Sequence, residues 1–158
     1  MNTKELNVEQ KLADLEITLP DAPKSSGNYL LLNQVDDLLY ISGITCKYNG
    51  EISHKGKVGK DLSVEEGYEA SKITTLNHLR LIKDYLGGFE KINKIVKVLG
   101  FVNSAPGFVH QPYVINGASK FLEEVFRENG KHARSAIGTN ELPFNIPVEI
   151  EIIVEVEQ

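Results

Sequence analysis

The chain contains a single cysteine, Cys46, among its 158 residues, and it contains no long hydrophobic run. One cysteine cannot form a disulfide within the chain, and this composition fits a reducing compartment. We interpret Cys46 as a small, buried apolar side chain rather than a reactive thiol. No stretch approaches the ~20 apolar residues of a membrane helix, and the charged segment 1–14 has no apolar signal-peptide centre. These absences predict a cytoplasmic protein that does not enter a membrane.

The motifs of metal, nucleotide and phosphate chemistry are also missing. None of the four histidines pairs at a metal-ligand spacing, and there is no second cysteine to act with Cys46. No Gly-x-Ser-x-Gly, Walker or Gly-x-Gly-x-x-Gly motif occurs. The net charge is −5 and the cations are scattered, whereas a nucleic-acid binder usually carries a basic stripe. The sequence therefore predicts no cofactor and no metal, and it argues against nucleic acid as the main partner.

The length suits one domain, which we assign to residues 1–158. Residues 1–20 are expected to form an N-terminal helical extension that packs on the rest, with Thr3 as its cap. Val8, Leu12 and Leu15 give this helix one apolar stripe. The segment 20–27, rich in Pro, Ser and Gly, then predicts a linker.

The rest of the chain predicts alternating strands and helices. Ser63 and Glu66 form a capping box for the clearest helix, which ends before Gly87. Pro112 suits the first turn of a second helix, which the Asn-Gly pair at 129–130 stops. Val148 and every second residue after it share one face of the last strand. The expected strands are 29–32, 38–42, 94–102, 133–137 and 148–156, and 47–61 is expected to be a mobile loop with room for a short strand.

This order, β-β-(β)-α-β-α-β-β, predicts an α+β fold. We expect a mixed β-sheet with two long helices packed on one face, plus the N-terminal helix. No further element remains to cover the opposite face of the sheet. Because an apolar sheet face must be buried against something, the chain is expected to associate with copies of itself.

Arg134 is unusual because it lies inside a short apolar strand, His-Ala-Arg-Ser-Ala-Ile. An arginine presents a fork of donors that matches a carboxylate. Two interpretations stay open: an anchor for a small acid in a partly dry cleft, or an edge-strand charge that reaches water or pairs with a strand carboxylate. Glu149 likewise either lines the same cleft and acts on water, or is a solvated strand charge.

Several segments match the motifs of one known family in order and in spacing. Each segment is weak alone, but together they are specific, and they span roughly residues 27–156. They are Gly27-Asn28-Tyr29, Leu39 to Gly43, Phe101-Val102, Val114-Ile115-Asn116 with Phe121, Ala133-Arg134-Ser135, Leu142-Pro143 and Val148-Glu149-Ile150-Glu151. In these segments the chain resembles the RidA (YjgF, endoribonuclease L-PSP) family, as a longer and divergent branch.

The resemblance implies a chorismate-mutase-like fold and a homotrimer with ligand clefts between subunits. It implies cofactor-free hydrolysis of 2-imino or 2-enamino acids, such as 2-aminoacrylate, to 2-oxo acids and ammonia. The carboxylate-binding role of the family falls on Arg134 and the water-activating role on Glu149. Substrate contacts fall on Tyr29, Ser42, Asn116 and backbone groups near Ala136.

The chain departs from the family around its arginine and at its N-terminus. Ala136 stands where active members often carry a cysteine, so thiol regulation at that position is excluded. His132 replaces a small residue or proline ahead of Arg134. The segment 47–61 is longer, and the N-terminal helix is additional. Two alternatives to the deaminase therefore stay open: a non-catalytic trimer that binds small carboxylates, and an endoribonuclease.

Overall fold

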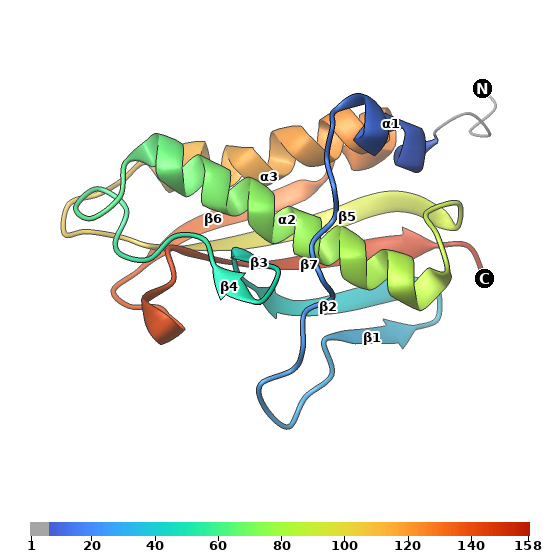
Figure 1. Cartoon of the computed structure of the whole chain (residues 1–158), viewed down its shortest axis with the longest axis horizontal. Coiled ribbons are helices and arrows are strands. Elements are labelled where there is room, and N and C mark those ends of the chain that lie inside the picture. Colours follow the sequence, from blue (N-terminus) through green and yellow to red (C-terminus); the bar gives the residue numbers. More distant parts are fainter. Residues whose placement is uncertain (1–6) are drawn as a thin grey trace.

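A computed structural model describes residues 7–158, so the predicted cap at Thr3 lies outside the described part of the chain. Five strands form one sheet in the order β1-β2-β7-β5-β6, and β3 and β4 form a separate small hairpin (Figure 1). The helices are α1 (Val8–Asp14), α2 (Val64–Leu86) and α3 (Gln111–Phe126), with short 3-10 helices η2 (Arg127–Gly130) and η3 (Pro143–Asn145). The strands are β1 (Leu32–Val35), β2 (Leu38–Ile44), β3 (Lys47–Tyr48), β4 (Glu51–Ile52), β5 (Ile92–Asn103), β6 (Ala133–Thr139) and β7 (Val148–Val156).

The sheet is mixed, as the sequence predicted. Strands β5 and β6 are parallel and are joined by the α3 crossover, whereas the other neighbouring strands are antiparallel. Both long helices lie on one face of the sheet (Figure 1). The prediction of an α+β fold with two long helices on one face is therefore confirmed. We call the opposite face of the sheet the open face.

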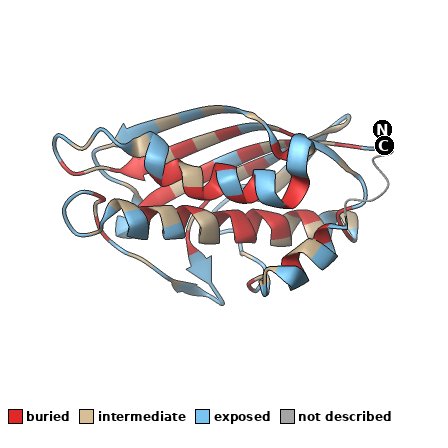
Figure 2. Cartoon of the chain, turned by 90° about the horizontal axis from the view of Figure 1, so that it is seen from above, coloured by how far each residue is buried: buried red, intermediate tan, exposed pale blue. Residues whose placement is uncertain are grey.

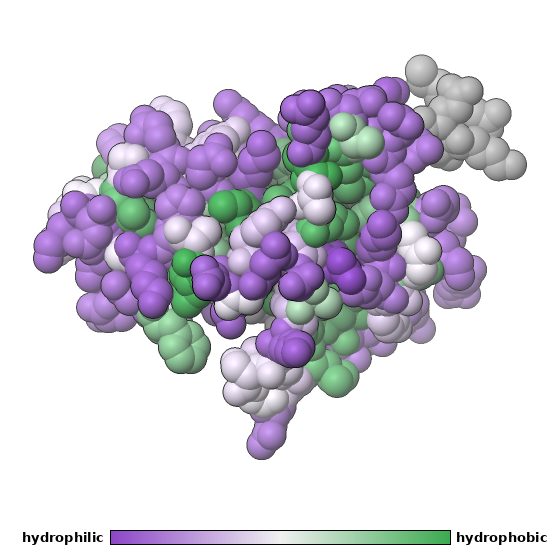
Figure 3. All heavy atoms as spheres, in the orientation of Figure 1, coloured by the Kyte–Doolittle hydropathy of each residue, from purple (hydrophilic) through white to green (hydrophobic). Residues whose placement is uncertain are grey.

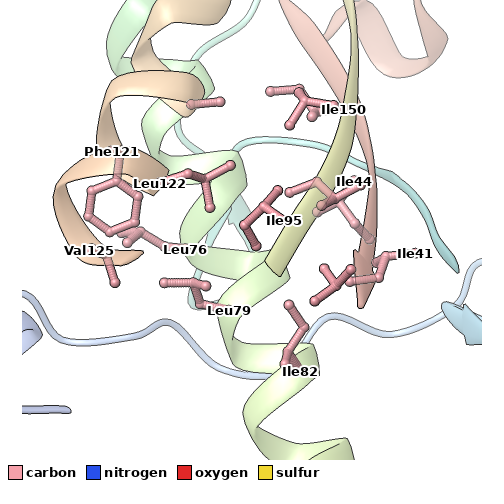
Figure 4. Packing of buried hydrophobic residues seen from close by; sticks show 14 of the residues in the cluster. Ile41, Ile44, Leu76, Leu79, Ile82, Ile95, Phe121, Leu122, Val125 and Ile150 are labelled. Atoms are coloured by element: carbon pink, nitrogen blue, oxygen red, sulfur yellow. The ribbon is translucent and has the colours of Figure 1, made fainter. Parts of the chain in front are cut away.

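The hydrophobic core lies between the two long helices and the sheet. Side chains from α2 and α3 meet those of β2, β5 and β7 (Figure 4), and buried residues line the sides of the helices that face the sheet (Figure 2). The strand predicted at 148–156 has the predicted bounds, and its alternate residues from Val148 to Val156 are buried. Helices α2 and α3 approach closely at Gly117, where a Cβ atom would overlap the Tyr68 carbonyl group.

The predicted ends of α2 are also correct. Ser63 and Glu66 form the capping box, and Gly87 ends the helix in the left-handed conformation that glycine adopts easily. The strand predicted at 29–32 is wrong, because β1 begins at Leu32 and its turn lies at Asp36 and Asp37. Tyr29 and Leu30 are largely exposed. The apolar residues of this segment are therefore surface side chains and do not mark a buried strand.

The N-terminal helix packs on the main core, as predicted. Val8 and Leu12 are buried in the main hydrophobic cluster, and the Asn7 side chain caps the helix by accepting from the Gln10 backbone N–H group. After α1 the chain crosses α2 in an extended segment, residues 15–31, which we call the strap (Figure 1). The Tyr48 hydroxyl donates to the Thr18 carbonyl at 3.0 Å, so the β3–β4 hairpin holds the strap in place.

The sequence allowed one short strand in the segment 47–61, and the structure has two, which pair as the β3–β4 hairpin. Beyond the hairpin, the Lys57 Nζ atom donates to the Asn103 side-chain oxygen at 2.8 Å and pairs with Glu141 at 3.2 Å. The Gly56 backbone N–H group donates to the Asn145 carbonyl at 2.8 Å. The far end of this segment is therefore tied to β5 and to the loop that follows β6.

The open face of the sheet carries apolar side chains that no described element covers. Tyr40 is 44 % exposed and Ile137 is 46 % exposed, and Leu99, Phe101 and Ile153 are only partly buried. The view of Figure 1, by contrast, shows a mostly hydrophilic surface with smaller hydrophobic patches (Figure 3). None of the helices within residues 7–158 is long and apolar enough to cross a membrane.

His78 of α2 is fully buried against β7, and this burial lowers its pKa to about 4. Its Nδ1 atom lies 3.0 Å from the Thr74 carbonyl oxygen and its Nε2 atom lies 2.9 Å from the Ile150 carbonyl oxygen. A neutral imidazole has only one N–H donor, so it satisfies one of these two acceptors at a time.

Acid is therefore expected to destabilise the protein through His78. Below about pH 6.5 the unfolded chain binds a proton at this residue, whereas the folded chain binds it only near the lowered pKa. The free energy of unfolding should fall by about 2 kcal/mol between about pH 7 and about pH 5 from this group alone. Urea unfolding at both pH values checks this, with His78→Gln as the control that should lose this part of the dependence. Equal pH dependence in the two proteins would contradict it.

Candidate functional site

Arg134 lies on the edge strand β6, beside Val98 of β5 in the parallel register. Val98 is fully buried under the helices, so Arg134 shares the helix side of the sheet. Its Nη1 atom donates to the Asn116 side-chain oxygen at 2.8 Å and to the Ser119 hydroxyl at 3.2 Å. No carboxylate among residues 7–158 pairs with it. The alternative of a structural ion pair with a strand carboxylate is therefore wrong for the described chain.

Two side chains of α3 hold the guanidinium. Asn116 and Ser119 are three residues apart, so they share one face of the helix. The placement of Asn116 beside Arg134 agrees with the sequence-based prediction, whereas Ser119 was not predicted. Ala136 lies two residues beyond Arg134 on the same side of β6 and packs against the core.

The Ser119 hydroxyl also meets His132, which the sequence had marked only as a departure from the family. The two side chains are 2.9 Å apart, from the Ser119 Oγ atom to the His132 Nε2 atom. The His132 Nδ1 atom lies 2.6 Å from the Gly130 carbonyl oxygen. We call Asn116, Ser119, His132 and Arg134 the arginine cluster.

Glu149 lies on the other side of the sheet, on β7, between the buried residues Val148 and Ile150. Burial raises the pKa of its carboxyl group, and the nearby charge of Glu151 raises it further. The carboxylate lies directly over Gly43, where an added Cβ atom would be 2.7 Å from the Glu149 Cδ atom. A carboxyl group that holds its proton more tightly than usual is a stronger base when ionised.

The position of Glu149 depends on an irregularity in β2. The register between β2 and β7 shifts between Ile41 and Ile44, as at a β-bulge, and such bulges often re-aim side chains beside functional sites. The bulge contains Ser42 and Gly43, which lie inside strand β2, because the strand continues to Ile44 rather than ending at the predicted residue 42. Glycine at position 43 leaves the space that the Glu149 side chain occupies.

Glu149 lines a cavity of about 460 Å³, within the size range of small-molecule sites. Tyr29, Gly43 and Phe144 are also in its wall, together with the cationic side chains Lys24 and Lys47. The strap thus contributes directly to the cavity. Phe144 was not predicted: it is 77 % exposed and has a left-handed backbone conformation with φ 58°, which costs free energy in a bulky residue.

Ser42 holds the part of the strap that carries Tyr29. Its hydroxyl donates to the Leu30 carbonyl at 2.6 Å, and its backbone N–H group donates to the Leu31 carbonyl at 2.9 Å. Tyr29 itself is 48 % exposed beside the cavity. In a single chain the direct contact of Ser42 is therefore with the strap, which fixes the Tyr29 position.

The predicted site residues fall into two groups that one chain does not bring together. Asn116, Arg134 and Ala136 lie on the helix side at the β6 edge. Tyr29, Ser42 and Glu149 lie on the opposite side, around β2 and β7. Strand β5 separates β6 from β7, so Arg134 and Glu149 are roughly 10 Å apart across the strands. They are also offset by three residues along β5, where they pair with Val98 and Phe101, and they lie on opposite faces.

Within residues 7–158, no three His, Cys, Asp or Glu side chains lie close enough together to hold a metal ion. The chemistry of the described groups is that of an anion-binding arginine and a basic carboxylate. The fold and these two groups define an α+β protein with an arginine on one side of its sheet and a half-buried carboxylate on the other.

The comparisons with known proteins assign the chain to a family. The family model "YjgF/chorismate_mutase-like, putative endoribonuclease" matches residues 9–156. Protein TCP17 of Trypanosoma cruzi is 36 % identical over 149 residues, which cover 94 % of this chain and 93 % of that protein. The chain therefore belongs to the YjgF/chorismate-mutase-like family, as the sequence motifs predicted.

Solved structures agree with this assignment. The protein Atu1372 of Agrobacterium tumefaciens, described as of unknown function, is 41 % identical with a TM-score of 0.89, over 95 % of this chain and 92 % of that one. A structure from Shewanella oneidensis described as a "putative endoribonuclease" is 29 % identical with a TM-score of 0.92, over 94 % and 99 %. RidA of an Antarctic Psychrobacter, at 24 % identity and a TM-score of 0.57 over 85 % and 94 %, shares the fold.

Proposed function

We propose that the protein hydrolyses reactive 2-imino and 2-enamino acids to 2-oxo acids and ammonia, without a cofactor, in clefts between the subunits of a homotrimer. The observation that carries this proposal is Arg134, which is partly buried and bonded only to neutral side chains in the described chain. Its charge and its remaining N–H donors are available to an acidic ligand. A planar guanidinium binds a carboxylate through two parallel hydrogen bonds.

Once the substrate carboxylate is bound, the reaction requires only proton transfers and a positioned water molecule. The enamine of 2-aminoacrylate takes a proton at its terminal carbon and becomes the imine. Water then adds to the imine carbon, the carbon–nitrogen bond breaks, and ammonia departs. The product that remains is a 2-oxo acid. Arg134 fixes the carboxylate so that the imine carbon meets a positioned water, and Glu149 takes a proton from that water.

The separation of the two groups of residues in one chain supports the proposed cleft between subunits. Arg134 and Glu149 face opposite sides of the sheet in one chain, so they act on one substrate only if they come from different copies. On the open face Tyr40 and Ile137 are exposed and Phe101 is partly buried. Burying such an apolar face against another copy of the chain is favourable. We propose that this contact brings the arginine cluster of one subunit to the cavity of its neighbour.

The test is direct turnover of a freshly generated imine. 2-Aminoacrylate formed in the assay from serine by a dehydratase should release ammonia and pyruvate faster with the protein than in buffer alone. The rate should rise in proportion to the protein concentration. Rates equal to the buffer rate across a range of 2-imino acids would contradict a deaminase.

Two other activities have an observation in their favour. If Arg134 binds a carboxylate but the protein catalyses no reaction, the protein is a regulator that binds small carboxylates. Small 2-oxo acids would then raise its melting temperature in a thermal-shift series, and no hydrolysis of 2-imino acids would be detected. An endoribonuclease is named in the description of the family, but the net charge of −5 works against binding an RNA backbone. Titration against single-stranded RNA, with binding that weakens as salt increases, would identify that activity.

A further inference from the structure

We propose that His132 is a positioning residue that fixes the carboxylate-binding geometry of Arg134 through the Ser119 hydroxyl. This inference rests on the proposed function, because it assigns a partner to the arginine that holds the substrate. It concerns residues outside the predicted site, since neither Ser119 nor His132 was assigned a role there. The contacts form one chain, from the Gly130 carbonyl through His132 and Ser119 to Arg134.

The hydrogen-bond directions along this chain are fixed by elementary chemistry. A carbonyl oxygen only accepts, so the short contact to Gly130 requires a proton on the His132 Nδ1 atom. A neutral imidazole then has a bare lone pair on Nε2, and the Ser119 hydroxyl must donate to it. Because the hydroxyl proton points at His132, the lone pairs of the Ser119 oxygen are left for the Arg134 Nη1 atom, which lies 3.2 Å away.

Without His132 the Ser119 hydroxyl loses the acceptor that fixes its orientation. A helical serine whose partner is removed commonly donates to the carbonyl of the preceding turn, and its lone pairs then turn away from Arg134. The guanidinium would keep its bond to Asn116 but lose its second fixed contact. Arg134 lies on an edge strand with one neighbouring strand, so little else described restrains its long side chain.

A serine bonded to a histidine is also the arrangement of an activated nucleophile. Two observations favour positioning. Ser119 is only 8 % exposed, and its oxygen already accepts a hydrogen bond from Arg134. A nucleophile needs a substrate within reach of that oxygen and free electron pairs to attack with. The two roles also predict different kinetics, because loss of a nucleophile abolishes kcat whereas loss of a positioning contact weakens substrate binding.

The experiment compares His132→Leu, His132→Gln and Ser119→Ala with the wild type. The glutamine side chain places its amide oxygen about where the Nε2 lone pair lies, so it can still accept from Ser119. The leucine variant removes the acceptor at similar size. Each protein is assayed for KM and kcat with 2-iminopropanoate, and for the Kd of pyruvate, a stable carboxylate, by calorimetry. Circular dichroism verifies that each variant is folded.

The loss of one net hydrogen bond corresponds to a roughly 5- to 10-fold weaker interaction. We expect His132→Leu and Ser119→Ala to raise KM and the pyruvate Kd by that factor with kcat changed less than KM. His132→Gln should stay within roughly 3-fold of the wild type. A leucine variant with unchanged KM and Kd overturns the inference, and so does a glutamine variant as impaired as the leucine variant. Loss of kcat in Ser119→Ala with unchanged Kd would overturn it in favour of a nucleophile.

Arg134→Ala separates a failure of this inference from a failure of the proposed function. If Arg134→Ala binds pyruvate as well as the wild type, or if the wild type does not bind it, the arginine is not a carboxylate anchor and both proposals are wrong. If Arg134→Ala loses binding while His132→Leu keeps it, only the role of His132 is wrong.

Discussion

Arg134→Ala is expected to lower kcat/KM for 2-imino acids by roughly 10²- to 10³-fold. Removing one member of a desolvated, hydrogen-bonded charge pair costs about 2–5 kcal/mol, and each 1.4 kcal/mol is tenfold in affinity or rate. Both steady-state kinetics and the Kd of a 2-oxo acid should report the loss. The fold should survive, because Arg134 contributes no ion pair to the described chain.

Arg134→Lys is the matched control for the shape of the donor rather than its charge. Lysine keeps the positive charge but replaces the planar fork with a compact ammonium group. If bidentate binding matters, this variant should recover only part of the loss, remaining roughly tenfold below the wild type. Full activity in the lysine variant would mean that charge alone attracts the substrate, and full activity in Arg134→Ala would remove the arginine from the mechanism.

Glu149→Gln is expected to lower kcat by roughly 10²-fold or more while KM changes little, because general base catalysis contributes that much to the chemical step. Glutamine keeps the size of the side chain over Gly43 but cannot take a proton. The raised pKa of Glu149 also predicts a pH dependence. The ionised base is lost as the pH falls through that pKa, so activity should decline at a higher pH than an ordinary glutamate would give. The same decline should be absent from the residual rate of Glu149→Gln.

Mixing the two inactive variants provides the strongest test of the intersubunit site. A cleft that takes Arg134 from a Glu149→Gln subunit and Glu149 from an Arg134→Ala subunit contains both wild-type groups. Co-expressed at equal amounts, the two variants should therefore regain about one quarter of the wild-type activity if subunits assemble at random. If both residues acted within one chain, no mixture would exceed the activity of its components.

The strongest periodic patterns of the sequence predicted the fold well. From Val148 to Val156 apolar residues occupy every second position because one face of the strand is buried. Ser63 and Glu66 satisfy backbone N–H groups at the start of their own helix. Such features depend on neighbours in the sequence, so they can be found without a structure. The strand predicted at 29–32 failed because Tyr29 and Leu30 are apolar but exposed, and composition alone does not separate an apolar surface segment from a buried strand.

The sequence named candidate site residues but did not predict how they are arranged. Asn116 was correctly expected near Arg134, because both lie in motifs of the family. Ser119 and His132 join them only through the packing of α3 against β6, a contact between residues distant in the sequence. The spacing of Asn116 and Ser119 on one helix face was the available signal. The close approach of the Glu149 carboxylate to Gly43 likewise depends on a β-bulge in β2, which no local sequence pattern predicts.

The strap gives the N-terminal extension an influence that its position in the sequence does not reveal. It is anchored at one end by the packing of α1 on the core and along its length by Tyr48, and it then supplies Lys24 and Tyr29 to the cavity wall. A change in the length or sequence of the strap would therefore reshape the wall of the cavity without any change in the sheet.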